Sequence, residues 1–203
     1  MVRNGNGVVR GIGLGVFVIF TAIFLPQDEQ QSSSATATDN ALLSSLYEAD
    51  QGDRKNGTMD MQTVERDALR REQVMGELRG GRIRTAKDHY NAAMVFQHGE
   101  SADEIRLAFS LAWIAAQMEP EKNEGSMWLS AAAWDRIMMR EKMPQWYGTQ
   151  YVSDGPNPEM KLYRVDESAV TDEERKRFHV PVLEEAKKRV DLINKTFGEK
   201  PDK

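Results

Sequence analysis

The sequence predicts a mainly α-helical protein, a compact bundle of about five to six helices with a small β-hairpin near the C-terminus. Three observations support this prediction. Apolar residues recur at helical spacing through residues 63–141, capping residues and Gly or Pro divide that stretch, and strand-like segments come only after Gln150. The 203 residues suffice for one ordinary domain plus an extension.

The first 26 residues have the pattern of an export signal. Met1–Arg10 is short and positively charged, and residues 11–25 carry no charge. Such a stretch makes about 22 Å of helix, less than the roughly 30 Å hydrocarbon core, which favours a cleaved signal peptide. The small-x-small triplet at 35–37 lies far beyond the apolar run, so a signal anchor in residues 11–25 is the alternative. Both forms predict an exported domain, periplasmic or extracellular.

A polar stretch separates this signal from the predicted domain. Residues 27–40 are rich in Gln, Ser and Thr, as expected of a flexible linker. Residues 41–200 are predicted to form a single helical domain. It begins with a short helix around Leu42–Tyr47, and residues 51–60 are predicted to be a loop with a turn at Asn56-Gly57.

Four longer helices are predicted next, each bounded by a cap or a breaker. They span approximately residues 63–79, 86–97, 102–118 and 125–141. Thr85 can cap the second helix, and Ser101 with Glu104 forms a capping box for the third. Gly80-Gly81 ends the first helix, and Gly99 is expected to close the second in the left-handed conformation.

The last three of these helices are apolar on nearly every face, which places them at the centre of a bundle. Alanine pairs at 92–93 and 131–132 lie 39 residues apart, a spacing that resembles Sel1 or tetratricopeptide repeats. The Gly, Tyr and Pro positions of such repeats do not recur. After Gln150, residues 151–152 and 160–165 are predicted to pair as a hairpin. Two helical segments follow, a short turn at 172–177 capped by Thr171 and a final helix at 182–196.

Composition excludes several classes of function. The formal net charge is −5, all of it in residues 38–203, which argues against nucleic-acid binding and leaves the N-terminal segment as the predicted membrane contact. The chain contains no cysteine, so thiolate catalysis, Fe–S clusters and Cys-based zinc sites are excluded. No metal-protease, phosphate-loop, dinucleotide or nucleophile-elbow motif occurs, and we expect neither a cofactor nor a metal.

Polar residues set among the apolar helices form the candidate site, because buried polar groups cost free energy unless they are paired. The candidate catalytic residues are His98, which can transfer protons near neutral pH, and Asp135. The candidate ligand-binding residues are Gln97, Arg136, Gln145, Tyr147, Thr149 and Gln150. In an enzyme, His98 would be the acid–base group, Arg136 would hold an anionic group, and residues 145–150 would orient a small polar ligand such as a sugar or a peptide.

The same residues allow a structural interpretation. His98 would then bind a loop carbonyl, while Asp135 and Arg136, which diverge by about 100° on a helix, would each need a separate partner. Asp53, Arg54, Glu65, Arg66 and Asp88 are the candidate partners. In this alternative the protein is a non-catalytic, helical-repeat-like interaction module, and its partner binds the charged helix at 63–79.

Several of these motifs occur together in one order. They are Asp53-Arg54, Gln97-His98-Gly99, Asp135-Arg136, Gln145-x-Tyr147-Gly148-Thr149-Gln150, Thr171-Asp172-x-x-Arg175 and Val180-Pro181. In this respect residues 50–190 resemble an uncharacterised family of bacterial proteins. The resemblance implies a type of domain and no particular reaction.

Overall fold

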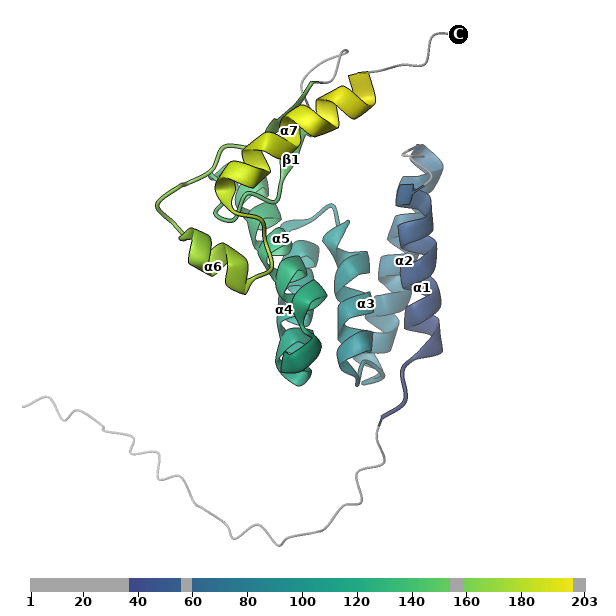
Figure 1. The fold of residues 1–203 in the computed structure, drawn as a ribbon. Coiled ribbons are helices and arrows are strands. Elements are labelled where there is room, and N and C mark those ends of the chain that lie inside the picture. The colour runs from purple at the N-terminus through teal and green to yellow at the C-terminus, as the bar shows by residue number, and fades with distance from the viewer. Residues whose placement is uncertain (1–36, 56–59, 154–158, 199–203) are drawn as a thin grey trace, which may run out of the picture. The chain divides into compact units, whose positions relative to one another are not determined.

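Capping residues and glycines set most of the helix ends in the computed structural model, which describes residues 37–55, 60–153 and 159–198. The prediction of a mainly α-helical protein with a small hairpin near the C-terminus is confirmed (Figure 1). The α-helices are α1 (Ala41–Lys55), α2 (Met61–Arg79), α3 (Ala86–Gln97), α4 (Ala102–Met118), α5 (Glu124–Arg140), α6 (Asp172–Arg177) and α7 (Leu183–Gly198). A 3₁₀ turn, η1 (Pro120–Lys122), precedes α5, and the strands are β1 (Tyr151–Ser153) and β2 (Met160–Leu162).

The predicted capping residues are confirmed. Thr85 accepts a hydrogen bond from the backbone N–H of Asp88, and the Asp88 side chain binds the N–H of Thr85 in return, which closes a capping box at α3. Ser101 and Glu104 do the same at α4. Such reciprocal caps satisfy backbone donors that have no partner inside the helix.

Two local predictions were wrong. Residues 51–55 were predicted to be a loop, but they form the last turn and a half of α1, because their charged side chains find partners on α2. Gly99 is not left-handed, whereas Gly81 is, with φ of 63°. Gly99 is required for close packing instead, since a Cβ there would lie 2.5 Å from Cβ of Glu104.

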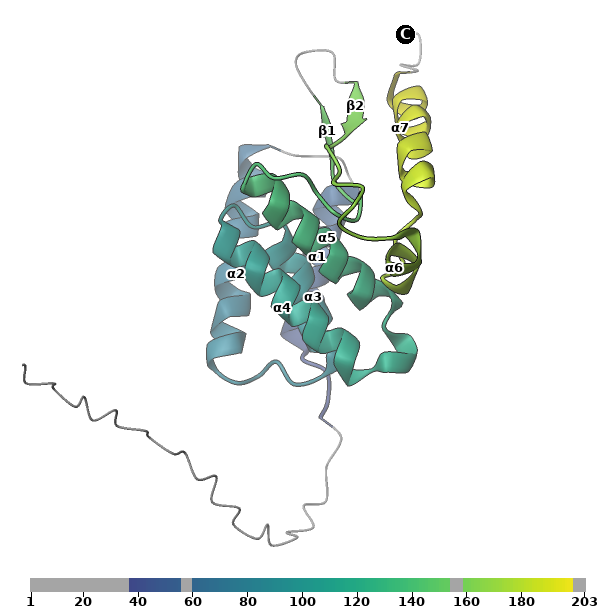
Figure 2. The same cartoon turned by 90° about the vertical axis from the view of Figure 1, so that its left-hand side faces the viewer.

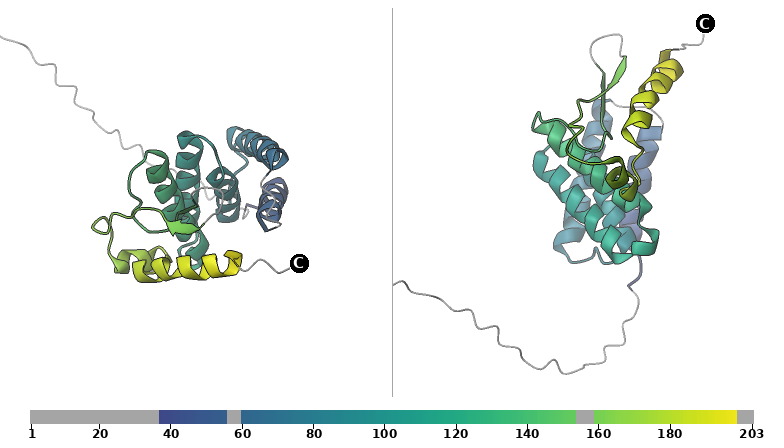
Figure 3. Two further views of the ribbon diagram at one scale, coloured as in Figure 1. Left: turned by 90° about the horizontal axis from the view of Figure 1, so that it is seen from above. Right: turned by 60° about the vertical axis from the view of Figure 1, so that its left-hand side comes forward.

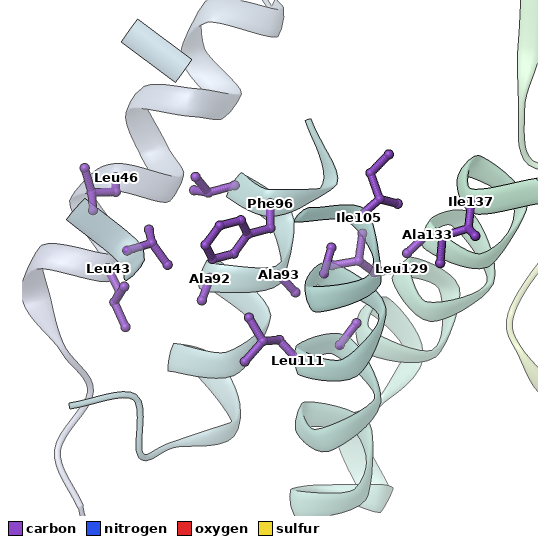
Figure 4. Packing of buried hydrophobic residues seen from close by; sticks show 14 residues of the cluster. Leu43, Leu46, Ala92, Ala93, Phe96, Ile105, Leu111, Leu129, Ala133 and Ile137 are labelled. Carbon is purple, nitrogen blue, oxygen red and sulfur yellow. The ribbon is translucent and has the colours of Figure 1, made fainter. Parts of the chain in front are cut away.

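The apolar core lies where α3, α4 and α5 pack against one another, with α1 against α3. Figure 4 shows Leu43 and Leu46 of α1 facing Phe96 of α3, with Leu129 and Ile137 of α5 farther along the same core. Alanines at the α3–α4 and α4–α5 contacts are almost completely buried, which lets the helix backbones approach closely.

Charged side chains join α1 to α2. Asp53 accepts hydrogen bonds from Arg66 at 3.1 Å and from Arg70 at 2.5 Å. Arg54 binds Asp67 through its two terminal guanidinium nitrogens, Nη1 at 3.2 Å and Nη2 at 2.6 Å. Arg70 also donates to Asp67. We call these five residues the α1–α2 ion ladder. A paired network of this kind satisfies charges that would otherwise be costly to bury.

The predicted hairpin is confirmed, and its register pairs Tyr151 with Leu162, Val152 with Lys161 and Ser153 with Met160. Helix α7 runs beside it (Figure 2), and the side chain of Asn194 binds both the N–H and the carbonyl of Met160, at 2.6 and 2.9 Å. Figure 3 shows α7 along a different side of the bundle from the α1–α2 pair. The described residues, 37–55, 60–153 and 159–198, belong to one compact unit.

The predicted signal peptide or anchor at 1–26 and most of the predicted linker at 27–40 lie outside the described residues. None of the helices in the described ranges is long and apolar enough to cross a membrane.

Candidate functional site

Asp135 organises the segment that follows α5. Its side chain is fully buried and accepts four hydrogen bonds, from the backbone N–H groups of Trp146, Tyr147 and Thr149 and from the Thr149 hydroxyl, at 2.8–3.0 Å. Burial raises the pKa of Asp135 above its usual range, against the lowering effect of these donors. Its partners are therefore loop donors rather than one of the cations considered from the sequence.

Gly148 and Arg175 complete this anchor. Gly148 has φ of 87°, a conformation that glycine adopts without strain, and it turns the backbone between the donors of Tyr147 and Thr149. On the other face of the loop, the buried guanidinium of Arg175 donates to the carbonyls of Tyr147 and Trp146, at 3.1 and 2.8 Å. Residues 146–149 are thus held through their N–H groups by a carboxylate and through their carbonyls by a cation.

Gln145 joins this loop to the segment after the hairpin. Its fully buried amide donates to the carbonyls of Gln150 and Tyr163, at 2.9 and 2.8 Å, and accepts from the N–H of Gln150 at 2.8 Å. The Gln145 side chain thus makes hydrogen bonds to backbone groups that a neighbouring strand would otherwise make. Gln145 is therefore occupied by the fold and offers no free group to a ligand.

His98 pairs with Asp50, a residue that the sequence reasoning did not select. Nδ1 of His98 lies 3.1 and 3.0 Å from the two carboxylate oxygens of Asp50, which is 1% exposed. A carboxylate only accepts, so Nδ1 carries the proton, and Nε2 is the ring nitrogen left for another partner. Across the described ranges, no protein group binds Nε2. The pair orients the imidazole as a carboxylate orients a general base.

Five of the predicted site residues line one hollow of about 370 Å³, which we call the Arg136 hollow. They are Gln97, His98, Arg136, Thr149 and Gln150. Gln51, Arg54, Trp128 and Tyr151 also contribute to its wall. Asp135 and Gln145 do not line this hollow. Tyr147 lies elsewhere, in an apolar pocket of about 300 Å³ with Trp113, Trp134 and Phe178.

Arg136 lines the Arg136 hollow without a partner among the described residues. Its guanidinium makes no hydrogen bond or ion pair with any residue that the structure describes, and its Nε is buried without an acceptor. Burial, followed by the charges of Arg140 and Arg54, lowers the pKa of Arg136. Oε1 of Gln97, in the same hollow, is likewise buried without a donor. Among the described residues, the hollow is therefore lined by a cation without a counter-charge, while Nε of Arg136 and Oε1 of Gln97 are closed to solvent beside it.

Two further hollows adjoin this one. One of about 390 Å³, the Arg71 hollow, shares Arg54, His98 and Arg136 with it. The other, of about 250 Å³ and here called the Arg189 hollow, shares Trp128, Thr149 and Tyr151 with it. Each neighbour therefore adjoins the Arg136 hollow along a shared wall, and we call the three hollows together the depression.

Within the described segments, no group of three His, Asp or Glu side chains is arranged to hold a metal ion. The sequence contained signals for two residues that were missed. Asp50 continues the stripe of Leu43 and Leu46 on α1, a pattern hidden when the helix was ended too early. Arg175 stood in the Thr171-Asp172-x-x-Arg175 motif, but nothing in its spacing pointed to a loop 28 residues away.

The resemblance to an uncharacterised bacterial family stays a prediction. No family model, no curated protein and no solved structure matches this chain.

Proposed function

We propose that this protein is an exported domain that binds a small, polar, anionic ligand in the Arg136 hollow. The observation that carries the proposal is the unpartnered guanidinium of Arg136. A largely buried charge without a counter-charge destabilises a fold, so a site that keeps one gains stability when an anion arrives. Carboxylate and phosphate groups match the planar guanidinium through paired hydrogen bonds.

The neighbours of Arg136 support the same function. His98 is oriented by Asp50 and keeps Nε2 for a ligand, and Gln97 lines the same hollow. His98 is also the acid–base group that this hollow provides. Asp135 makes four hydrogen bonds inside the protein, and these occupy the oxygens that a proton transfer to a ligand would need. The proposal therefore assigns proton transfer, in an enzyme, to His98 with Asp50 rather than to His98 with Asp135.

Replacing Arg136 with Met tests the proposal. We expect wild-type protein to unfold at a higher temperature in acetate or phosphate than in chloride of equal ionic strength. Arg136→Met should lose this effect and should itself be as stable as wild type or more stable, because it removes an uncompensated charge. The loss in anion affinity should be about tenfold to a hundredfold, as expected for charge-assisted hydrogen bonds.

Arg106→Met is the control, because Arg106 is half exposed and pairs with Asp103 and Glu141 away from the hollow. It removes the same charge and should keep the response to anions. Two results would overturn the proposal: wild type that no anion stabilises, or an Arg136→Met protein that is much less stable than wild type. The second result would mean that Arg136 is a structural residue.

The alternative proposal, an interaction module, draws support from α2. Met61 and Leu69 on this charged helix are 74% and 60% exposed, so two large apolar side chains of α2 are accessible to a partner. A partner that binds α2 would protect these residues. Double substitution of Met61 and Leu69 with Ser should then abolish partner binding and leave the anion response of the Arg136 hollow unchanged.

A further inference from the structure

The depression is larger than a simple anion requires. An acetate or phosphate ion would fill a small part of the Arg136 hollow alone, and the Arg189 hollow extends the same wall past Trp128 and Tyr151. A ligand that uses both hollows must be elongated and must carry groups that suit each of them. The unpartnered side chains show which groups these are.

A ligand in the Arg136 hollow needs both an acceptor and a donor. Nε of Arg136 and Oε1 of Gln97 are closed to solvent, so the groups that a ligand can meet are the outer guanidinium nitrogens of Arg136, which need an acceptor, and Nε2 of His98. With its proton on Nδ1, the neutral ring accepts at Nε2, and a carboxylate or a phosphate dianion supplies no donor for it. A molecule with an acid group next to hydroxyl groups satisfies both, because a hydroxyl group donates and accepts at one atom.

Aromatic rings stand between the two hollows. Trp128, which is 38% exposed, and Tyr151 line both of them. An aromatic face in a polar groove offers a flat apolar surface beside hydrogen-bonding groups. The CH face of a sugar ring is also flat and apolar, while its edge carries hydroxyl groups, so a sugar matches this alternation of surfaces.

A second free cation lies in the Arg189 hollow. Arg189 is exposed and has no ion pair or hydrogen bond with the residues described. Arg189 and Tyr151 line this hollow together. Among the residues described, the depression therefore holds two cations without counter-charges, Arg136 in one hollow and Arg189 in the next, and Trp128 and Tyr151 line both hollows.

From these observations we infer that the ligand is an acidic oligosaccharide, with one uronic-acid unit in the Arg136 hollow and the next in the Arg189 hollow. This inference rests on the proposed anion site. One carboxylate binds Arg136 and a hydroxyl group donates to Nε2 of His98. The sugar ring stacks on Trp128, and the second carboxylate lies at Arg189.

Calorimetric titration of the full chain in mild detergent tests the inference. The probes are acetate, galacturonic acid, digalacturonic acid, the neutral disaccharide digalactose and the acidic dipeptide Glu-Glu. We expect digalacturonic acid to bind at least tenfold more tightly than galacturonic acid and at least a hundredfold more tightly than acetate. The neutral disaccharide should bind at least tenfold more weakly than digalacturonic acid.

Trp128→Ala should weaken digalacturonic acid binding at least tenfold and leave acetate binding unchanged. Trp113→Ala is the matched control, because Trp113 is 40% exposed but lies outside the depression. If Trp128→Ala does not fold, saturation-transfer NMR on wild type replaces it. The ring protons of digalacturonic acid should then receive saturation from aromatic protons of the protein.

The possible outcomes separate this inference from the proposed function. Acetate binding that depends on Arg136, with digalacturonic acid no tighter than acetate, would overturn the sugar and keep the anion site. Tighter binding of Glu-Glu than of digalacturonic acid would overturn the sugar in favour of an acidic peptide. An absence of binding by every probe would overturn the proposed function as well.

Discussion

Asp135 and Arg136 are adjacent in sequence but differ in their partners within the fold. Because neighbouring residues on a helix point about 100° apart, Asp135 binds the loop at 146–149 while Arg136 lines the hollow named after it. Asp135 has all its partners, and Arg136 has none among the described residues. A residue whose charge is fully matched serves the fold, and a residue whose charge is unmatched is available to a ligand.

Asp135→Asn should destabilise the protein by about 3 kcal/mol. In either orientation the asparagine amide nitrogen would face backbone N–H groups of the loop, those of Trp146 and Tyr147 or that of Thr149, and would leave donors without an acceptor. Urea unfolding measures this change. Asp103→Asn, at a side chain 92% exposed, should change stability by less than about 0.5 kcal/mol. Equal stability of the two variants would contradict the anchoring role of Asp135.

At the scale of elements, Gly99 allows the short, closely packed connection between α3 and α4. A Cβ on Gly99 would lie 2.5 Å from Cβ of Glu104 and 2.9 Å from the carbonyl of Phe96. The short connection also sets the position of His98, the C-cap residue of α3. The packing at this junction therefore helps to place a wall residue of the Arg136 hollow.

Gly99→Ala should destabilise the protein by about 1–3 kcal/mol, since the backbone must move to relieve the contacts. Gly76→Ala is the paired control, because a Cβ at this exposed position in α2 meets nothing within 4 Å. It should stabilise the protein by roughly 0.5–1 kcal/mol through helix propensity. Thermal unfolding of both variants checks the pair. A stabilising Gly99→Ala would mean that the α3–α4 junction is not tightly packed.

The contribution of the α1–α2 ion ladder to the stability of the protein should decrease at low pH. Hydrogen bonds from Arg66 and Arg70 lower the pKa of Asp53 to about 2. A carboxylate with a depressed pKa in the folded state stabilises the protein above its unfolded pKa of about 4, and this contribution disappears as the pH falls through about 2. Asp53→Asn should therefore be less stable than wild type at pH 6. The difference should shrink between pH 4 and pH 2.

Urea unfolding of both proteins across this range measures the effect. A difference in stability that stays constant from pH 6 to pH 2 would show that Asp53 does not gain its stability from the two arginines.

At the scale of the whole molecule, the depression is built from residues distant in sequence. Arg54 comes from α1, His98 from the end of α3, Arg136 from α5 and Gln150 from the segment before β1. The loop anchored by Asp135 and Arg175 brings Thr149 and Gln150 to the helices. An exported protein with such a site would meet its ligand outside the cytoplasm.

We expect the protein to be found outside the cytoplasm when its full sequence is expressed in a bacterium. Fractionation followed by N-terminal sequencing measures this. A mature N-terminus at Thr38 would indicate a signal peptide cleaved after the 35–37 triplet. An intact N-terminus in the membrane fraction, resistant to alkaline extraction, would indicate an anchor at residues 11–25. Intact protein in the cytoplasm would contradict the predicted export.

The sequence by itself determined the fold class and most of the element ends. Helical spacing, capping residues and Gly breakers act over three or four residues, so α3, α4, the hairpin and α6 could be located from local pattern alone. The end of α1 could not, because residues 51–55 are helical through partners on α2. Local pattern also selected the polar residues from which both the loop anchor and the hollow are made.

Only the tertiary structure decided what each polar residue does. Whether a buried polar group belongs to the fold or is open to a ligand depends on its partners, and partners such as Asp50 for His98 lie 48 residues apart. The structure divides the predicted residues accordingly. Asp135 and Gln145 are bound within the loop anchor, while Gln97, His98 and Arg136 line a hollow in which the described residues leave the charge of Arg136 and Nε2 of His98 unmatched.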